Sequence, residues 1–116
     1  MTKKKYYCPV EVTVDAIGGK WKSRIMWHLS HQKYRYGELN RLIPEVTRKM
    51  LSQALHELED DGLIKRVEYY GKILKVEYEL TEYGQSLTPL LEMMSEWGKQ
   101  HLSKGLSMPT ESTQSS

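Results

Sequence analysis

The sequence predicts an α+β fold that is mainly helical, with one small β-hairpin in its second half and a long helix near its C-terminal end. Apolar residues recur at helical spacing through most of the chain, whereas two runs rich in β-branched and aromatic residues flank Gly71-Lys72. A chain of 116 residues without an internal repeat has the size of one domain. We therefore expect residues 9–104 to form the folded domain, between an N-terminal arm of residues 1–8 and a disordered tail of residues 105–116.

Three short helices are predicted in the first 45 residues, because each of three segments carries an apolar stripe. Gly18-Gly19 ends the first helix, and Pro44 stops the third. Each helix therefore has one face to bury. In chain order, the stripes consist of Val10, Val14 and Ile17, of Trp21, Ile25 and Leu29, and of Tyr36, Leu39 and Ile43.

The segment "PEVTRKMLSQALHELEDDGLI" gives the clearest helix signal of the chain. Thr47 is a good N-cap, because its hydroxyl can accept a hydrogen bond from a free amide of the first turn. Gly62 followed by Leu63 is typical of a Schellman-type helix end. We expect a helix over residues 47–61 that turns its leucines inward. These leucines are Leu51, Leu55 and Leu58.

The outward face of this helix is cationic and polar at one end and acidic at the other. Acidic side chains at a helix C-terminus oppose the macrodipole, and they also repel phosphate. A polyanion would therefore meet the helix at its basic N-terminal end. That end carries Arg48, Lys49, Ser52, Gln53 and His56, and the far end carries Glu57, Glu59, Asp60 and Asp61.

Two strands and one more helix are predicted in the rest of the chain. The strands cover residues 63–70 and 73–80, with Gly71-Lys72 at the tip of the hairpin. Thr81 then caps a long helix, in which Pro89 should produce a kink or an offset first turn, because its ring clashes with the carbonyl four residues earlier. The apolar positions of that helix are Leu87, Leu90, Leu91, Met94, Trp97 and Leu102.

Two helices joined by a short turn and followed by a hairpin form the winged helix-turn-helix pattern, which predicts double-stranded DNA as the partner. Residues 1–56 hold 11 Lys/Arg against four Asp/Glu, whereas the remaining residues hold six against 11. This imbalance favours a polyanion partner, although scattered solvated charge explains it equally well. Recognition-helix side chains can reach base edges in the major groove, and cations elsewhere can follow phosphates or enter a narrow minor groove. The predicted base-reading residues are Thr47, Arg48, Lys49, Ser52, Gln53 and His56, and the predicted wing and backbone contacts are Lys20, Arg35, Arg66, Lys72 and Lys75.

Four segments of the chain, in order from Cys8 to Trp97, resemble the HxlR-type transcriptional regulators, a branch of the MarR-like winged-helix proteins. They are "CPVEVTVDAIGGKWKSRIMWHL", "RYGELNRLIP", "TRKMLSQALHELEDDGLIKR" and "VEYELTEYGQSL". The resemblance implies a bacterial, homodimeric, DNA-binding regulator whose recognition helix holds Thr47, Arg48, Lys49, Ser52 and Gln53. The chain differs from the family at two places. It has "VTRK" where the family often has "ISQK", and its hairpin sequence "YYGKILK" lacks the prolines common in the family.

The long C-terminal helix also predicts a homodimer. Its apolar stripe is larger than the core of a 116-residue chain needs, and pairing with a second copy, together with the first helix, would bury it. Such a dimer would place two recognition helices roughly 34 Å apart, one DNA turn, on an inverted-repeat operator. The alternative is that the stripe closes the core of a single chain. The predicted interface residues are Val10, Val14, Leu90, Leu91, Met94 and Trp97.

Cys8 is the only cysteine and is the candidate for a redox-sensing residue. Pro9 suits the first position of a helix, which makes Cys8 a plausible N-cap with its sulfur near free amides, and Lys3, Lys4 and Lys5 lie just upstream. Both features favour the reactive thiolate, which could form a bridge between subunits, form a mixed disulfide, or be alkylated. The resemblance supports this hypothesis, since several HxlR-type regulators sense oxidants or electrophiles at this position. A buried and inert thiol is the alternative.

No pattern indicates catalysis, a cofactor or a metal site, so we expect a protein that is not an enzyme. "GGKWKS" lacks the earlier glycine and the hydroxyl of a phosphate-binding loop, and His28 and His31 have no third ligand at metal spacing. The absence of a leader pattern and of an 18-residue apolar window predicts a cytoplasmic protein. Three alternatives stay open: a regulator controlled by a small ligand in the dimer cleft, a thiol-dependent enzyme using Cys8, and an interaction module that does not bind DNA.

Overall fold

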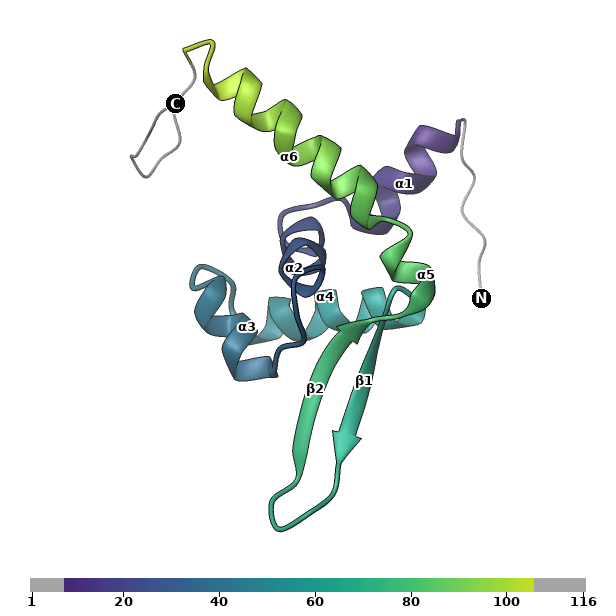
Figure 1. Ribbon diagram of the computed structural model, residues 1–116, viewed down its shortest axis with the longest axis vertical. Coiled ribbons are helices and arrows are strands. Elements are labelled where there is room, and N and C mark those ends of the chain that lie inside the picture. The colour runs from purple at the N-terminus through teal and green to yellow at the C-terminus, as the bar shows by residue number, and fades with distance from the viewer. Residues whose placement is uncertain (1–7, 106–116) are drawn as a thin grey trace. The chain divides into compact units, whose positions relative to one another are not determined.

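The computed structural model describes residues 8–105; residues 1–7 of the predicted arm and 106–116 of the predicted tail lie outside the described residues. The chain divides into two compact units, one ending at Ser86 and one beginning at Leu87. No helix of the described part is long and apolar enough to cross a membrane. In the first unit the elements are α1 (Pro9–Ile17), α2 (Lys22–Leu29), α3 (Tyr36–Leu42), α4 (Arg48–Asp60), β1 (Ile64–Tyr69), β2 (Lys75–Leu80) and α5 (Glu82–Gln85), and the second unit holds α6 (Thr88–Leu102) (Figure 1).

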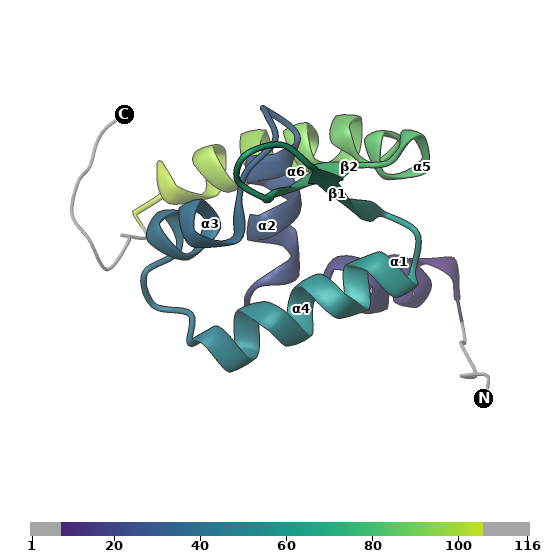
Figure 2. The same ribbon diagram turned by 90° about the horizontal axis from the view of Figure 1, so that it is seen from below.

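The core of the first unit is built by α2, α3 and α4. Figure 2 shows α3 and α4 joined by a short turn, with α2 packed against α4. Burial of one large aliphatic side chain contributes about 1.5–3 kcal/mol to the free energy of folding. The buried side chains of α2, α3 and α4 therefore hold the helix-turn-helix together. The predicted stripes of these three helices are confirmed, except that two of their residues, Trp21, which precedes α2, and Tyr36, are only half buried. The largest fully buried side chains are Ile25, Met26, Leu39, Ile43, Leu51, Leu55 and Leu58.

Both predicted ends of α4 are confirmed by their hydrogen bonds. The Thr47 hydroxyl accepts a hydrogen bond from the Met50 amide at 3.1 Å. At the other end, Gly62 adopts a φ of +75°, which a residue without a Cβ adopts at low cost. Its amide donates to the carbonyl of Glu59, and the next amide donates to the carbonyl of Leu58, which is the Schellman pattern. Helix α4 therefore begins and ends where the sequence indicates.

The hairpin is an antiparallel pair that projects away from the helices (Figure 1). Ile64 pairs with Leu80 at its root and Tyr69 with Lys75 at its far end, which leaves residues 70–74 as the loop. The root is attached to the helix-turn-helix, because β2 also pairs with the segment that precedes α3. Tyr34 and Tyr78 exchange backbone hydrogen bonds of 3.2 and 2.8 Å. The position of the wing is therefore fixed relative to α3 and α4.

The prediction of one long helix from Thr81 is wrong, because the segment forms two helices. Thr81 does act as a cap, since its hydroxyl accepts a hydrogen bond from the Gly84 amide at 2.9 Å, but α5 ends at Gln85. Pro89 lies in the first turn of α6, where its missing N–H costs nothing. Continuing α5 through Pro89 would bring its ring against the carbonyl of Gln85. The proline therefore starts a new helix instead of kinking one.

Candidate nucleic-acid interface

The outward face of α4 is the candidate interface. All six residues predicted to read bases are exposed, and the opposite face of the helix is buried. This separation follows from the sequence, because the leucines of the stripe recur every three or four residues. The exposed set is Thr47, Arg48, Lys49, Ser52, Gln53 and His56. Their accessibility agrees with the predicted role.

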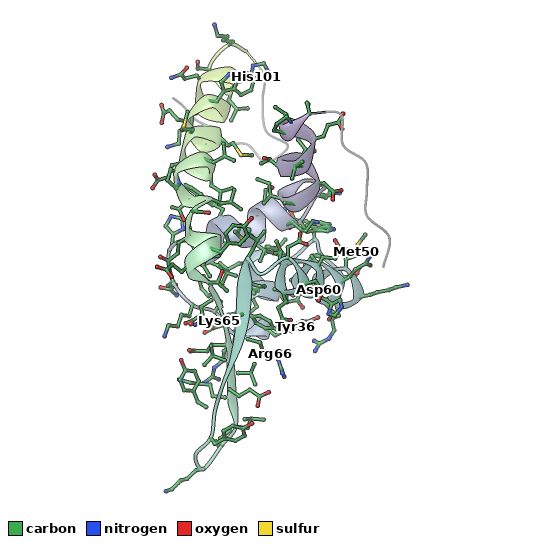
Figure 3. All side chains as sticks on the ribbon, turned by 90° about the vertical axis from the view of Figure 1, so that its right-hand side faces the viewer. Tyr36, Met50, Asp60, Lys65, Arg66 and His101 are labelled. Atoms are coloured by element: carbon green, nitrogen blue, oxygen red, sulfur yellow. The ribbon has the colours of Figure 1, made fainter. Side chains whose placement is uncertain are left out.

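An open groove of about 550 Å³ runs between the start of α3, the first turns of α4 and the hairpin. Figure 3 shows two of its residues, Tyr36 and Arg66, which come from α3 and β1. The groove joins three of the predicted base-reading residues on α4 to one predicted wing residue, Arg66, on one surface. Its lining consists of Tyr36, Arg48, Lys49, Ser52, Arg66, Val76 and Tyr78.

Tyr36 is a site residue that sequence reasoning assigned only to the core. Its ring is half buried, and its hydroxyl donates to the carbonyl oxygen of Arg48 at 2.9 Å. The same hydroxyl lies 2.9 Å from the Ser52 hydroxyl oxygen, and the Arg48 guanidinium lies over the ring, 5.3 Å from its centroid. Tyrosine at the edge of an apolar stripe is the signal that was available, because a buried ring places its hydroxyl where it can find a polar partner.

The cationic residues of the first turn of α4 have no acidic partner within the described chain. Neither Arg48 nor Lys49 forms an ion pair with residues 8–105. Further along the helix, the Gln53 amide donates to the Glu57 carboxylate at 3.3 Å, and His56 Nε2 lies 3.3 Å from the Asp60 carboxylate. The helix therefore presents open cations at its N-terminal end and internally paired polar groups in its middle.

The hairpin cations are less available than the sequence indicates. Arg66 forms an ion pair with Glu68 at 2.8 Å, and Lys75 lies 3.7 Å from Glu77. Both pairs are exposed, so each contributes little to stability, but each glutamate offsets the charge that phosphate would meet. Lys72 is the one hairpin cation of the described chain without an ion pair. The wing therefore carries little net positive charge.

The other two predicted backbone contacts lie outside the groove. Lys20 is exposed beside the start of α2, with its ammonium 5.1 Å from the centroid of the Trp21 ring. Arg35 is exposed immediately before α3, and its backbone amide donates to the Glu38 carboxylate at 2.8 Å. Neither position contradicts a contact to phosphate.

Two side chains near the helix-turn-helix have pKa values shifted by burial. Burial raises the pKa of Tyr78, which lines the groove, so its phenol stays neutral. Burial, with help from Arg24, lowers the pKa of His28. His28 packs edge-on against Tyr34, and among the described residues no cluster of three or more ligands could hold a metal ion.

Cys8 occupies the predicted N-cap position of α1, with Pro9 following it. Its side chain is exposed, so the alternative of a buried thiol is wrong for this chain. Its side chain forms no capping hydrogen bond with the free amides of the first turn. The three lysines upstream lie outside the described residues.

The residues predicted for a dimer interface divide into exposed and buried ones. On α1, Val10 and Val14 are exposed and only Ile17 is buried. On α6, Met94 is 45% exposed and Trp97 is 65% exposed, which leaves large apolar surface open to solvent. Leu90 is half buried and Leu91 is buried.

Comparison with known proteins places this chain among HTH-type transcriptional regulators. Residues 16–105 match the family described as HxlR-like helix-turn-helix. The uncharacterized HTH-type transcriptional regulator YtcD of Bacillus subtilis is 53% identical over 104 residues, which are 90% of this chain and 82% of the relative. The structure of the redox regulator HypR in its oxidized form is 46% identical, with a TM-score of 0.76, and covers 80% of this chain and 96% of the other. A structure from Porphyromonas gingivalis assigned to the MarR family is 33% identical, with a TM-score of 0.74, and covers 85% of this chain and 97% of the other.

Proposed function

This chain belongs to the HxlR-like helix-turn-helix family of transcriptional regulators, and from that premise we propose that it binds inverted-repeat operators in double-stranded DNA as a homodimer. The recognition helix α4 enters the major groove with its N-terminal half. The acidic C-terminal end of the helix stays away from the phosphates, because Glu59, Asp60 and Asp61 would be repelled by them. No catalytic step forms part of this proposal.

The proposal rests mainly on the exposed cations in the first two turns of α4. Arg48 and Lys49 are exposed and form no ion pair within the described chain, while the leucines behind them are buried. A guanidinium fork can bind guanine O6 and N7 together, and the Gln53 amide can bind adenine N6 and N7. For Gln53 this requires release of its 3.3 Å hydrogen bond to Glu57. Arg48 is therefore the strongest candidate for reading a base.

The remaining cations are assigned to the DNA backbone. Lys20, Arg35 and Lys72 are exposed and form no ion pair within residues 8–105. Contacts of this kind orient the protein on the duplex and make its affinity depend on salt, without selecting a sequence. Arg66 and Lys75 contribute to the same field, reduced by their glutamate partners.

The homodimer is supported by the apolar surface left open on both units. Exposed valines on α1 and the exposed Met94 and Trp97 on α6 are side chains that a second copy would cover. A two-fold axis relates the two recognition helices, so the operator has the same symmetry. Half-sites are then expected roughly 34 Å apart, one turn of B-DNA. Because the DNA is its partner, we assign the protein to the cytoplasm.

The test is binding of the DNA upstream of the protein's own gene, measured by fluorescence anisotropy. A scrambled duplex of the same length and composition is the control. We expect the upstream duplex to bind about 10³-fold more tightly or better, with both affinities falling between about 50 and 200 mM salt. Equal affinity for the two duplexes, at every salt concentration, would contradict sequence-specific regulation by this DNA.

Control of DNA binding by Cys8 is the second part of the proposal. The support is the exposed thiol at the start of α1 and the 46% identity to HypR, which is described as a redox regulator. Modification of Cys8 would shift α1 against the partner subunit and so change the spacing of the two recognition helices. Operator affinity would change with it, because only one spacing fits the half-sites.

Diamide treatment of wild-type protein and of Cys8→Ser tests this control. Diamide takes two electrons and two protons from two Cys8 thiols and leaves one S–S bond between subunits. We expect operator affinity to change in the wild type alone, with a reducible cross-linked dimer on gels. If both proteins responded identically, thiol control would be wrong. The regulator would remain, with a small ligand in the dimer cleft as its means of control.

A further inference from the structure

The tip of the hairpin exposes more apolar surface than its own packing explains. We define the wing tip as residues 70–74, the loop between β1 and β2. Within it, Ile73 is 83% exposed, Tyr70 80% and Leu74 56%. Single exposed apolar residues are common on protein surfaces, but three large ones within five residues form a patch. A patch of this kind is suited to contact with another molecule.

The charge of this hairpin does not favour a role limited to phosphate contacts. Its strands carry three glutamates, and each cation on them has a glutamate partner within 4 Å: Arg66 with Glu68, Lys75 with Glu77, and Lys65 with Glu79. Glu68 also accepts a hydrogen bond from the Tyr70 hydroxyl, which raises the pKa of that phenol and keeps it neutral. Lys72 is the one unpaired cation of the tip within the described chain. The tip therefore offers one positive charge on an otherwise apolar surface.

The place of the wing tip follows from the groove at the hairpin root. Strand residues Arg66, Val76 and Tyr78 line the same groove as Arg48 of the recognition helix. From that root the hairpin projects away from the helices (Figures 1 and 3). Six strand residues span roughly 20 Å, which is a little more than half of the ~34 Å turn of B-DNA. When α4 lies in the major groove, the tip therefore reaches the neighbouring minor groove.

We propose that the wing tip is an apolar wedge for the minor groove, in which Ile73 and Leu74 enter between base pairs and kink the duplex while Lys72 contacts a phosphate. This inference rests on the proposed DNA binding and adds a mode of contact to it. Apolar side chains in the minor groove unstack a base step and bend DNA toward the major groove. Pyrimidine–purine steps unstack most easily. The operator is therefore expected to carry TA or CA steps beside each half-site, at positions that no side chain reads by hydrogen bonding.

The test uses a duplex that the wild-type protein enriches from a random-sequence pool, labelled with a fluorophore at each end. Energy transfer between the ends reports the bend, and a salt series reports the phosphate contacts. The test variant is the double substitution Ile73→Ser with Leu74→Ser, and the matched control is Lys72→Gln between the same strands. Both variants change exposed loop residues, and thermal unfolding verifies that the fold is intact.

The two variants are expected to affect different properties: the serine variant changes the bend of the DNA, and Lys72→Gln changes the salt dependence of binding. The serine variant should bind about tenfold more weakly, with a straighter duplex and an unchanged salt slope, because it loses apolar contact and no charge. Lys72→Gln should keep the bend and lower the salt slope by about one. Enriched sequences should hold TA or CA steps at the flanks.

Three outcomes would overturn the inference. If the wild type bound its enriched duplex without bending it, the wedge would be wrong and the proposed function would stand. If the serine variant bound and bent DNA as the wild type does, Ile73 and Leu74 would take no part in bending, and the wedge would be wrong. If no duplex were enriched at all, the proposed function and the wedge would fall together.

Discussion

At the scale of single residues, Tyr36 determines how the start of the recognition helix is held. Its hydroxyl is bonded to the Arg48 carbonyl and the Ser52 hydroxyl, and its ring lies under the Arg48 guanidinium. A guanidinium that lies over an aromatic ring adopts fewer orientations than a free one. It therefore loses less conformational entropy when it binds a base. Tyr36 is therefore a positioning residue for Arg48.

Replacing Tyr36 with Phe tests this role, because the ring stays and the two hydroxyl contacts are lost. We expect a loss of about 1 kcal/mol in unfolding free energy in urea, since the hydrogen bond to Arg48 is only partly replaced by water. Discrimination between operator and scrambled DNA should fall several-fold, with little change for the scrambled duplex. The control is Tyr83→Phe, whose exposed ring has no side-chain hydrogen bond within the described chain. Equal discrimination by wild type and Tyr36→Phe would show that the contact is structural only.

The exposed face of α4 could be predicted from the sequence, but the contacts that modify it could not. Periodicity assigns each helix residue to one face, so the exposure of Arg48 and Gln53 follows from the leucine positions alone. The bond from Tyr36 depends on how α3 approaches α4, which no local pattern encodes. The pairs of Arg66 with Glu68 and Lys75 with Glu77 were within reach, because residues two apart share one face of a strand.

At the scale of secondary-structure elements, one junction links the recognition helix to the wing and to α5. The carbonyl of Leu63, just after α4, accepts from the Thr81 amide at 3.1 Å, and the Thr81 hydroxyl donates to the Gly62 carbonyl at 2.6 Å. Gly84 lies against the same backbone, buried, so that a Cβ there would lie 1.9 Å from the Leu63 carbonyl oxygen. The end of α4, the root of the hairpin and α5 therefore share one close contact.

Gly84→Ala is expected to destabilise the protein by roughly 1–3 kcal/mol, because backbone must move to accept the methyl group. The matched control is Gly37→Ala on α3, where a Cβ would meet only the Arg41 side chain, at 3.7 Å. That change should stabilise the helix by up to about 1 kcal/mol. Urea unfolding of the two variants measures both effects. Equal midpoints would contradict the close packing of Gly84.

Element boundaries show where sequence signals were sufficient. The N-cap and the Schellman end of α4 are each specified by residues within a few positions, and both were predictable. The division between α5 and α6 was missed because Thr81 and the leucines beyond it fit one continuous helix. The effect of Pro89 on a continuous helix was predicted, but its outcome was not. The residues around a proline do not distinguish one that starts a helix from one that kinks it.

At the scale of the whole molecule, the proposed function depends on a second copy of the chain. One recognition helix reads only a few base pairs, and the second half-site adds affinity because the first has already brought it close. The sequence predicted a dimer from the excess of apolar residues on the last helix. Exposure of Met94 and Trp97 agrees with that argument, whereas Leu91 is buried.

Trp97→Glu is expected to weaken the dimer at least about tenfold, since a charge would be buried where an aromatic ring packs. Operator affinity should fall with it. The control is Lys99→Gln, which changes the charge by the same amount on the opposite side of α6. Sedimentation velocity at several concentrations, beside anisotropy on the operator, measures both properties. A Trp97→Glu protein that stayed dimeric would place the interface elsewhere.

The central claim is that the first turns of α4 read base pairs, and Arg48 tests it most directly. Anisotropy on the operator and on scrambled DNA should be measured for wild type, Arg48→Ala and Arg48→Lys at one salt concentration. We predict a loss of about 1–3 kcal/mol on the operator for Arg48→Ala and a much smaller loss on scrambled DNA. Arg48→Lys should keep the scrambled affinity and still lose discrimination, because lysine cannot form the two-pronged contact. Equal weakening of both duplexes by Arg48→Ala would contradict base reading by this helix.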